Sequence, residues 1–119
     1  MAAGGIAMKE HSRARMLRIH FGEDDKWQGK ALHAAILQTC EELGIASAVV
    51  YRGIEGYGAS ARLRHASHWK FSKDAPIVVT VIDSEEQIAR LLPHLDEMVV
   101  EGLVAASSVE VIRLSRSAG

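Results

Sequence analysis

The chain has 119 residues and a net charge of −1, with 14 basic and 15 acidic side chains, so we expect one domain and no nucleic-acid partner. Hydrophobic residues make up 48% of the sequence, which allows a core, and an aromatic content of 5% makes that core aliphatic. One cysteine, Cys40, excludes an internal disulfide framework, and no apolar run approaches the roughly 20 residues of a membrane helix. No secretory signal is evident, so the expected location is the cytoplasm.

The first half of the sequence predicts a strand followed by a helix. Residues 1–15 are small and polar and are expected to form a flexible leader. Residues 17–21 alternate apolar and polar side chains, as a half-buried strand does. In the polar turn that follows, the side chain of Asp24 or Asp25 is placed to cap the next helix. That helix is expected over residues 30–43, with Gly44 at its end and Cys40 on its apolar face.

The second half predicts two buried strands, a second helix and a last strand. Residues 45–51 and 77–82 are apolar on both strand faces, whereas residues 58–75 show no clear element beyond a weak alternation at 67–71. Ser84 and Gln87 match the capping box of a helix that Pro93 is expected to kink or restart. The last strand is expected over residues 109–114. The expected apolar face of the second helix consists of Ile88, Leu91, Leu92, Leu95, Met98 and Val99.

The predicted order is β-α-β-β-α-β, which fits an α+β, ferredoxin-like fold: a four-stranded antiparallel sheet with two helices on one face. The domain is expected to span residues 16–114, with residues 115–119 as a tail. Two helices cover only one face of such a sheet, yet the second and third strands are apolar on both faces. The uncovered face is therefore expected to contact another copy of the chain, which predicts a homo-oligomer.

The segment that follows the second predicted strand is rich in glycine and arginine. Its three glycines allow the backbone to approach a ligand closely, and its arginines supply paired donors suited to phosphate or carboxylate. The alternative is a strand end with a bulge and a tight turn, because the glycine spacing is not that of a dinucleotide-binding loop. The candidate ligand-binding residues lie in this segment or at places expected to border the same cleft: Arg52, Gly53, Gly56, Gly58, Arg62, Arg64, Lys30 and Gly102.

Two further kinds of function remain open on the sequence. His65 and His68, three residues apart, could bind a metal ion together with Asp74, which would make the chain a metal-binding module. No catalytic triad, acid/base carboxylate pair or nucleophile motif is evident, so we do not expect an enzyme, although a small hydrolase or isomerase stays as an alternative. The remaining alternative is a structural oligomer that binds no small ligand.

Four segments of the sequence together carry a resemblance to a known family. They are Gly22-Glu23-Asp24-Asp25-Lys26-Trp27, Arg52-Gly53-Ile54-Glu55-Gly56-Tyr57-Gly58, Asp83-Ser84-Glu85-Glu86 and Leu95-Asp96-Glu97-Met98. With these motifs in register over residues 16–114, the chain resembles domain of unknown function family 190. That family is similar to the PII signal-transduction proteins, which have a ferredoxin-like fold, form trimers and bind adenine nucleotides in clefts between subunits.

The resemblance implies a regulatory protein that forms a homotrimer and binds an adenine nucleotide, with magnesium as a possible companion. A loop from about Gly53 to Trp69 would then correspond to the T-loop, which reports the bound state to a protein target such as a membrane transporter or channel. Residues 99–105 would form another wall of the cleft. PII proteins carry a glycine- and lysine-rich phosphate loop at that place, whereas this chain has no lysine there and Glu101 would repel phosphate.

Overall fold

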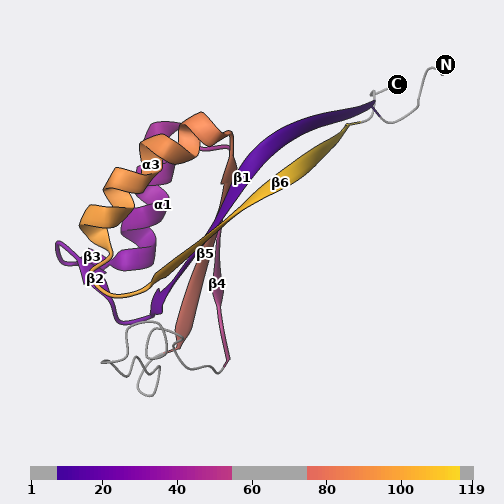
Figure 1. Cartoon of the computed structure of the whole chain (residues 1–119). Helices are drawn as coiled ribbons and strands as arrows, with labels where there is room; N and C mark the ends of the chain where they lie inside the picture. Colours follow the sequence, from indigo (N-terminus) through magenta and orange to yellow (C-terminus); the bar gives the residue numbers. More distant parts are fainter. Residues whose placement is uncertain (1–7, 55–74, 116–119) are drawn as a thin grey trace.

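The computed structural model describes residues 8–54 and 75–115, with side chains from residue 11 onward. Along the chain it contains β1 (Met8–Gly22), β2 (Lys26–Trp27), β3 (Lys30–Ala31), α1 (Leu32–Leu43), β4 (Ser47–Arg52), β5 (Pro76–Asp83), α3 (Glu85–Met98) and β6 (Leu103–Ser115). The four long strands form one antiparallel sheet in the order β4-β5-β1-β6, and β2 pairs with β3 in a small hairpin. Both helices lie on the same face of the sheet (Figure 1). The predicted ferredoxin-like fold is therefore confirmed.

The core lies between the helices and the face of the sheet that they cover. Alternate residues of β1 and β5 point into it, as the strand period of two requires, and the apolar stripes of α1 and α3 close it. Its buried side chains are Leu17, Ile19, Phe21, Leu32, Ala35, Ile36, Cys40, Ile77, Val79, Val81, Ile88, Leu91, Leu95 and Met98. Cys40 is buried in the core as expected, and burial raises the pKa of its thiol to about 11, which favours the protonated thiol at neutral pH. Within the described ranges, no helix is long and apolar enough to cross a membrane.

The ends of α1 are held by the backbone rather than by the expected acidic side chain. Gly44 adopts a left-handed conformation at φ 73°, and the N–H of Ile45 donates to the carbonyl of Cys40 at 2.9 Å, so the predicted glycine stop is confirmed. At the other end, Ala31 occupies the N-cap position and provides no side-chain bond. The N–H of Leu32 donates instead to the backbone carbonyl of Asp25 at 2.8 Å. The prediction of a side-chain cap by Asp24 or Asp25 was wrong, because the β2–β3 hairpin lies between these residues and the start of α1.

The start of α3 confirms the predicted cap and adds a contact between the helices. Ser84 Oγ accepts the N–H of Gln87 at 3.2 Å. The Gln87 side chain does not return to the cap; it donates to the carbonyls of Leu43 and Gly44, at 3.0 and 3.3 Å, which satisfies groups at the end of α1. The helix continues as one element past Pro93, so the expected restart does not occur. Leu92 is also 43% exposed, rather than part of the apolar face as expected.

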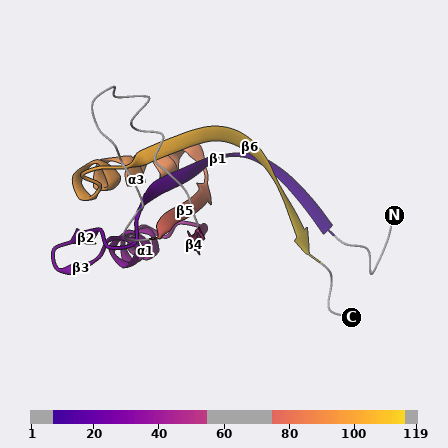
Figure 2. The ribbon, with the colours of Figure 1, turned by 90° about the horizontal axis from the view of Figure 1, so that it is seen from below.

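Two strands are longer than expected, and together they form an arm. Residues 8–15, expected as part of a leader, form the first half of β1, and β6 begins at Leu103 instead of residue 109. The two strands pair from Met8 with Ser115 to His20 with Leu103. Beyond Arg15, where pairing with β5 ends, they continue as a ribbon of two strands that projects from the body (Figures 1 and 2). Because residues 8–15 lack apolar alternation, only their distant partner strand reveals them.

The face of the sheet that carries no helix, which we call the outer face, is largely apolar. The strand register arranges it in three rows across β4, β5, β1 and β6. The rows are Tyr51-Val78-His20-Leu103, Val49-Thr80-Arg18-Ala105 and Ser47-Ile82-Met16-Ser107. Val49 and Tyr51 are 45% and 57% exposed, respectively. The sequence argument that one sheet face stays apolar and uncovered within the described chain is thus borne out.

Candidate functional site

The candidate site lies at one edge of the sheet, where β1 and β4 end and β5 and β6 begin. We call this the loop edge, because the segment between Ile54 and Ala75 connects there. Two backbone bonds hold it together: Glu23 N–H donates to Ala75 O at 2.8 Å, and Gly53 N–H donates to Pro76 O at 2.7 Å. The sheet register therefore fixes the point from which the predicted ligand-binding loop departs.

Arg52, the last residue of β4, forms a two-pronged ion pair at this edge. Its Nε and Nη2 atoms donate to the two carboxylate oxygens of Glu23, at 2.8 and 3.1 Å. The hydrogen bonds from Arg52 lower the pKa of Glu23, and the same bonds raise the pKa of Arg52. Both side chains remain open to solvent, so the pair can exchange for another partner at modest cost. Arg52 therefore meets an incoming anion only in competition with Glu23.

Gly53 and Gly102 are both required by close packing at the loop edge. A Cβ atom on Gly53 would lie 2.6 Å from Cγ of Pro76, and one on Gly102 would lie 2.5 Å from the backbone oxygen of His20. No side chain fits at such distances without movement of the neighbours. Close packing is therefore a structural reason for glycine at both positions, and it does not require a ligand. The role of the two glycines in ligand binding stays a prediction.

Lys30 lies in β3, next to α1, and borders a hollow that neither Arg52 nor Gly53 lines. Its Nζ atom donates to Oε1 of Gln38 at 2.7 Å, and the two side chains line a small hollow that Trp27 and Met98 also border. Gly102 lines a different hollow, between the end of α3 and the start of β6, together with Leu95. The structure thus brings Arg52 and Gly53 together but does not show Lys30 in the same pocket.

His20 lies on the outer face in the row nearest the loop edge. Partial burial, followed by the positive charge of Arg18, lowers the pKa of its imidazole. A lowered pKa favours the neutral imidazole at pH 7, so His20 adds little positive charge to the outer face. The neutral state suits a contact between subunits, which is the role expected for the uncovered face of the sheet.

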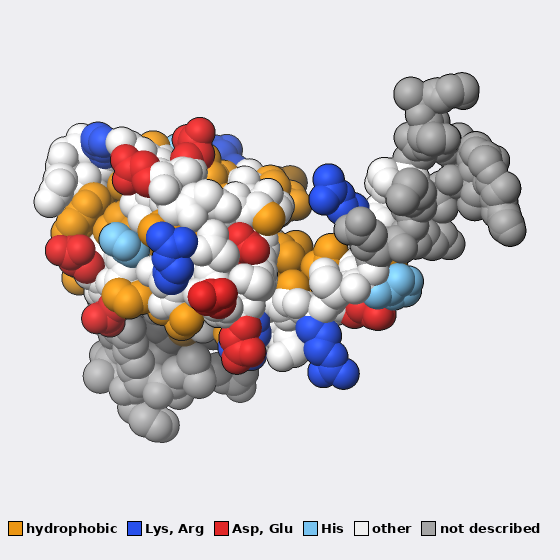
Figure 3. Space-filling view, turned by 90° about the horizontal axis from the view of Figure 1, so that it is seen from above, with side chains coloured by type: hydrophobic (Ala, Val, Ile, Leu, Met, Phe, Trp, Pro, Cys, Tyr) orange, Lys and Arg blue, Asp and Glu red, His pale blue; other side chains and the backbone are white. Residues whose placement is uncertain are grey.

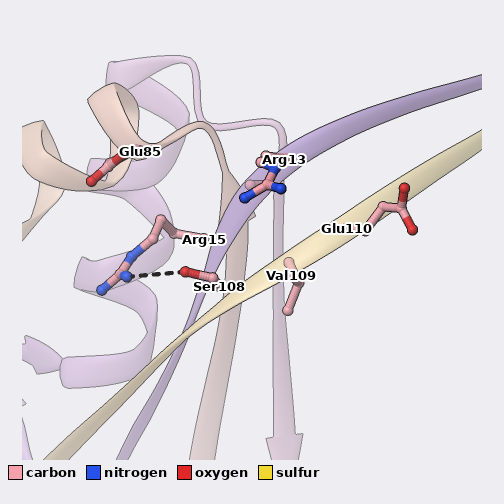
Figure 4. Close-up of a pocket in the computed structure, with 7 residues that line it drawn as sticks. Arg13, Arg15, Glu85, Ser108, Val109 and Glu110 are labelled. Atoms are coloured by element: carbon pink, nitrogen blue, oxygen red, sulfur yellow. Dashed lines mark hydrogen bonds between the residues drawn. The ribbon is translucent and has the colours of Figure 1, made fainter.

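A hollow larger than these two lies elsewhere, where the arm leaves the body. It has a volume of about 480 Å³ and borders Arg13 and Arg15 of β1, Ser108 and Glu110 of β6, and Glu85 at the start of α3. Figure 4 shows Arg15 reaching Ser108, an Nη1–Oγ contact of 3.4 Å, while Glu110 lies farther out along the ribbon. This groove was not predicted, because residues 13 and 15 were expected to belong to a flexible leader. The available signal was the pair of arginines two residues apart, which puts both on one strand face.

Several predicted site residues cannot be placed. Gly56, Gly58, Arg62, Arg64, His65 and His68 lie outside the described residues, and so does the weak strand pattern at residues 67–71. Within residues 8–54 and 75–115, no group of three or more histidine, cysteine or acidic side chains is arranged to hold a metal ion. The partner of Arg52 that sequence reasoning missed is Glu23. It follows the first strand, and in a ferredoxin-like topology that strand ends at the same end of the sheet as β4, with β5 between the two.

Comparison with known proteins identifies the family. The model of DUF190, described as "Uncharacterized ACR", matches residues 14–111. The chain belongs to the DUF190 family. It is 34% identical over 102 residues to a UPF0166 protein of Aquifex aeolicus, covering 86% of this chain and 96% of that protein. A UPF0166 protein of Methanocaldococcus jannaschii is 31% identical over 102 residues, with 85% and 94% covered.

Solved structures similar to this DUF190 chain are PII-like proteins. The apo form of CPII from Thiomonas intermedia, described as a nitrogen regulatory PII-like protein, has a TM-score of 0.63 at 15% identity over 89% of this chain and 99% of that one. CPII bound to ADP and bicarbonate has a TM-score of 0.61 at 15% identity, with 86% and 91% covered. A putative PII-like signaling protein from Thermus thermophilus has a TM-score of 0.54 at 17% identity, with 87% and 91% covered. At these identities the likeness establishes a shared PII-like fold.

Proposed function

We propose that this protein is a PII-like regulator that binds a small anionic effector, an adenine nucleotide, in clefts between the subunits of a homotrimer. The effector binds at the loop edge, with magnesium as a possible companion, and the loop from Gly53 to Trp69 reports the bound state to a protein target. A membrane transporter or channel is the class of target that the resemblance to PII proteins suggests. The ADP bound to the structurally similar CPII supports the choice of nucleotide.

The observation that carries this proposal is the Arg52–Glu23 pair at the base of the loop. The carboxylate of Glu23 neutralises the guanidinium of Arg52, the last residue before Gly53. A phosphate offers more charge and the same two-oxygen geometry, so it can replace Glu23 on Arg52. Arg62 and Arg64 supply further donors from the loop itself. Binding would then order the loop around the anion, which is a known physical route for a switch.

The outer face supports assembly with other copies of the chain, and the trimer is the assembly that the resemblance to PII proteins suggests. Its three rows leave an apolar surface on the side of the sheet opposite the helices, and such surfaces mark protein contacts. We place the loop edges of neighbouring subunits next to each other in this assembly, since each outer face extends to its loop edge. Effector binding between subunits follows from this arrangement, with the loop of each chain at the cleft.

Replacement of Arg62 and Arg64 by Ala is expected to weaken ADP binding by roughly 10- to 100-fold, since each charge-assisted bond contributes about 1.5–3 kcal/mol and solvent recovers part of it. The assembly should stay intact, because the outer face proposed to form it consists of residues of the four strands. Isothermal titration with ADP measures the first effect, and light scattering measures the second.

Arg90→Ala provides the matched control for this double variant. Arg90 is an exposed arginine of α3, and its Nη1 atom bonds Gln87 of the same helix, so its loss should leave ADP affinity unchanged. Loss of the assembly in the Arg62/Arg64 variant, or an equal loss of affinity in Arg90→Ala, would contradict the assignment of the loop as the effector site.

A further inference from the structure

Glu23 contacts both sides of the loop edge. Its carboxylate accepts two hydrogen bonds from Arg52 at the end of β4, and its N–H donates to the carbonyl of Ala75, just before β5, at 2.8 Å. The residue before it, Gly22, pairs with Pro76, the first residue of β5. The sheet and this backbone bond therefore fix the point from which the carboxylate of Glu23 reaches Arg52.

The contact between Glu23 and Arg52 has the geometry with which an arginine holds a phosphate. Nε and Nη2 of Arg52 lie 2.8 and 3.1 Å from the two carboxylate oxygens, so the edge of the guanidinium that suits a two-oxygen anion is already occupied. The same bonds lower the pKa of Glu23 and raise the pKa of Arg52, so each group holds the other in its charged form. An anion that binds to this edge of Arg52 must displace Glu23.

The attraction for an anion at the loop edge is local. Basic and acidic side chains are interspersed over both the body and the arm on the face that Figure 3 shows, and the whole chain has a net charge of −1. Affinity for an anion therefore depends on individual groups such as Arg52 rather than on a broad positive field. The Arg52 and Glu23 side chains are 65% and 38% exposed, so a ligand in solution can reach the pair and exchange with the carboxylate.

We propose that Glu23 is a built-in competitor that lowers the affinity of the loop edge for anions. When the protein occupies its own binding group, the apparent dissociation constant rises by the inverse of the fraction of molecules in which that group is free. Glu23 therefore raises the dissociation constant of every anion that needs Arg52 by the same factor. Weakly bound anions leave Arg52 on Glu23, whereas a phosphorylated effector with further contacts displaces the carboxylate. This inference rests on the proposed function and adds the residue that sets its affinity.

A Glu23→Gln variant is expected to bind ADP roughly two- to fivefold more tightly than the wild type, the range for loss of an exposed ion pair. The variant keeps the size of the side chain and loses the charge that competes for Arg52. A gain in affinity is diagnostic, because damage to the structure of this turn would weaken binding instead. Isothermal titration measures the change.

Glu86→Gln is the matched control for this variant. It removes the same charge from an exposed position of α3, beyond the end of β5 that lies opposite the loop edge, so the affinity for ADP should stay unchanged. An equal gain in Glu86→Gln would show that the net charge of the chain, and not the pair with Arg52, controls binding, which overturns the inference.

The Arg52→Gln background separates competition from simple repulsion. Competition acts through Arg52, so the gain from Glu23→Gln should largely disappear in that background, whereas a gain of the same size would mean that Glu23 only repels the ligand. If Arg52→Gln leaves no measurable binding, the Nε–H resonance of Arg52 decides. ADP shifts this resonance if Arg52 exchanges partners, and an unmoved resonance in a protein that has bound ADP overturns the inference.

The outcomes distinguish this inference from the proposed function. Equal ADP affinities of the wild type and Glu23→Gln overturn the competition and leave the proposed function standing. A Glu23→Gln variant that binds ADP beside a wild type that does not supports the inference and contradicts ADP as the effector of the native chain. Absence of ADP binding by both proteins overturns the inference and counts equally against ADP as the effector.

Discussion

A Val49→Glu variant is expected to be monomeric at micromolar concentrations at which the wild-type chain is assembled. Val49 is 45% exposed on β4, in the middle row of the outer face, between Thr80 on the neighbouring strand and open solvent. A carboxylate there costs little in an isolated chain, because water reaches it. In the assembly, the same carboxylate is buried without a partner, at a cost of about 3–5 kcal/mol, which is a loss of roughly 100-fold or more in association. Light scattering over a dilution series measures the change.

Leu92→Glu is the matched control for this variant. Leu92 is 43% exposed, almost the same as Val49, but it lies on α3, which covers the opposite side of the sheet. The same substitution at the same exposure should therefore leave the mass in solution unchanged. If Leu92→Glu dissociates the protein and Val49→Glu does not, the helices rather than the outer face form the interface, and the proposed trimer is wrong.

A Leu91→Ala variant is expected to lower the free energy of unfolding by about 2–5 kcal/mol. Leu91 is fully buried in the core, where α3 packs on the sheet, so truncation loses apolar contact and leaves a cavity that the strands cannot fill. Urea unfolding, followed by circular dichroism, measures the loss. The comparison is best made in a Val49→Glu background, since association of the wild type would add a concentration-dependent contribution to stability.

Leu92→Ala, one residue further along, tests whether the effect belongs to burial. Its side chain is 43% exposed, so the same truncation should cost less than about 1 kcal/mol. The sequence periodicity placed both leucines on one apolar face, and the structure separates them. Similar losses for the two variants would mean that α3 is rotated about its axis relative to the structure described above.

Hydrophobic periodicity was sufficient to predict the fold. The alternation at residues 17–21, the two-sided apolar run at 77–82, the Ser84 cap and the Gly44 stop each depend on neighbours close in sequence, and each is found in the structure. The same local information explains the uncovered apolar face, because two helices cannot cover both sides of four strands. The arm escaped prediction because residues 8–15 have no apolar period of their own, and their pairing partner lies about a hundred residues away.

The candidate site was predictable only in part. Arg52 was identified from its residue type and position, but its pairing with Glu23 depends on the register that brings the ends of β1 and β4 to one edge. Gly53 and Gly102 were predicted to bind a ligand, and that role stays a prediction. What the structure shows is close packing beside Pro76 and His20, which requires glycine and which no local pattern reveals. The groove at the base of the arm was missed for the same reason as the arm itself.

The most direct test of the central claim is calorimetric titration of the wild-type protein, first shown by light scattering to be an oligomer, with ATP, ADP, AMP and cyclic AMP, with and without magnesium. The proposed function predicts saturable binding of at least one of these nucleotides, near one molecule per subunit. No binding of any nucleotide by a confirmed oligomer would contradict it. Glu101 and the missing lysine before β6 would then mark a cleft that no longer accepts phosphate.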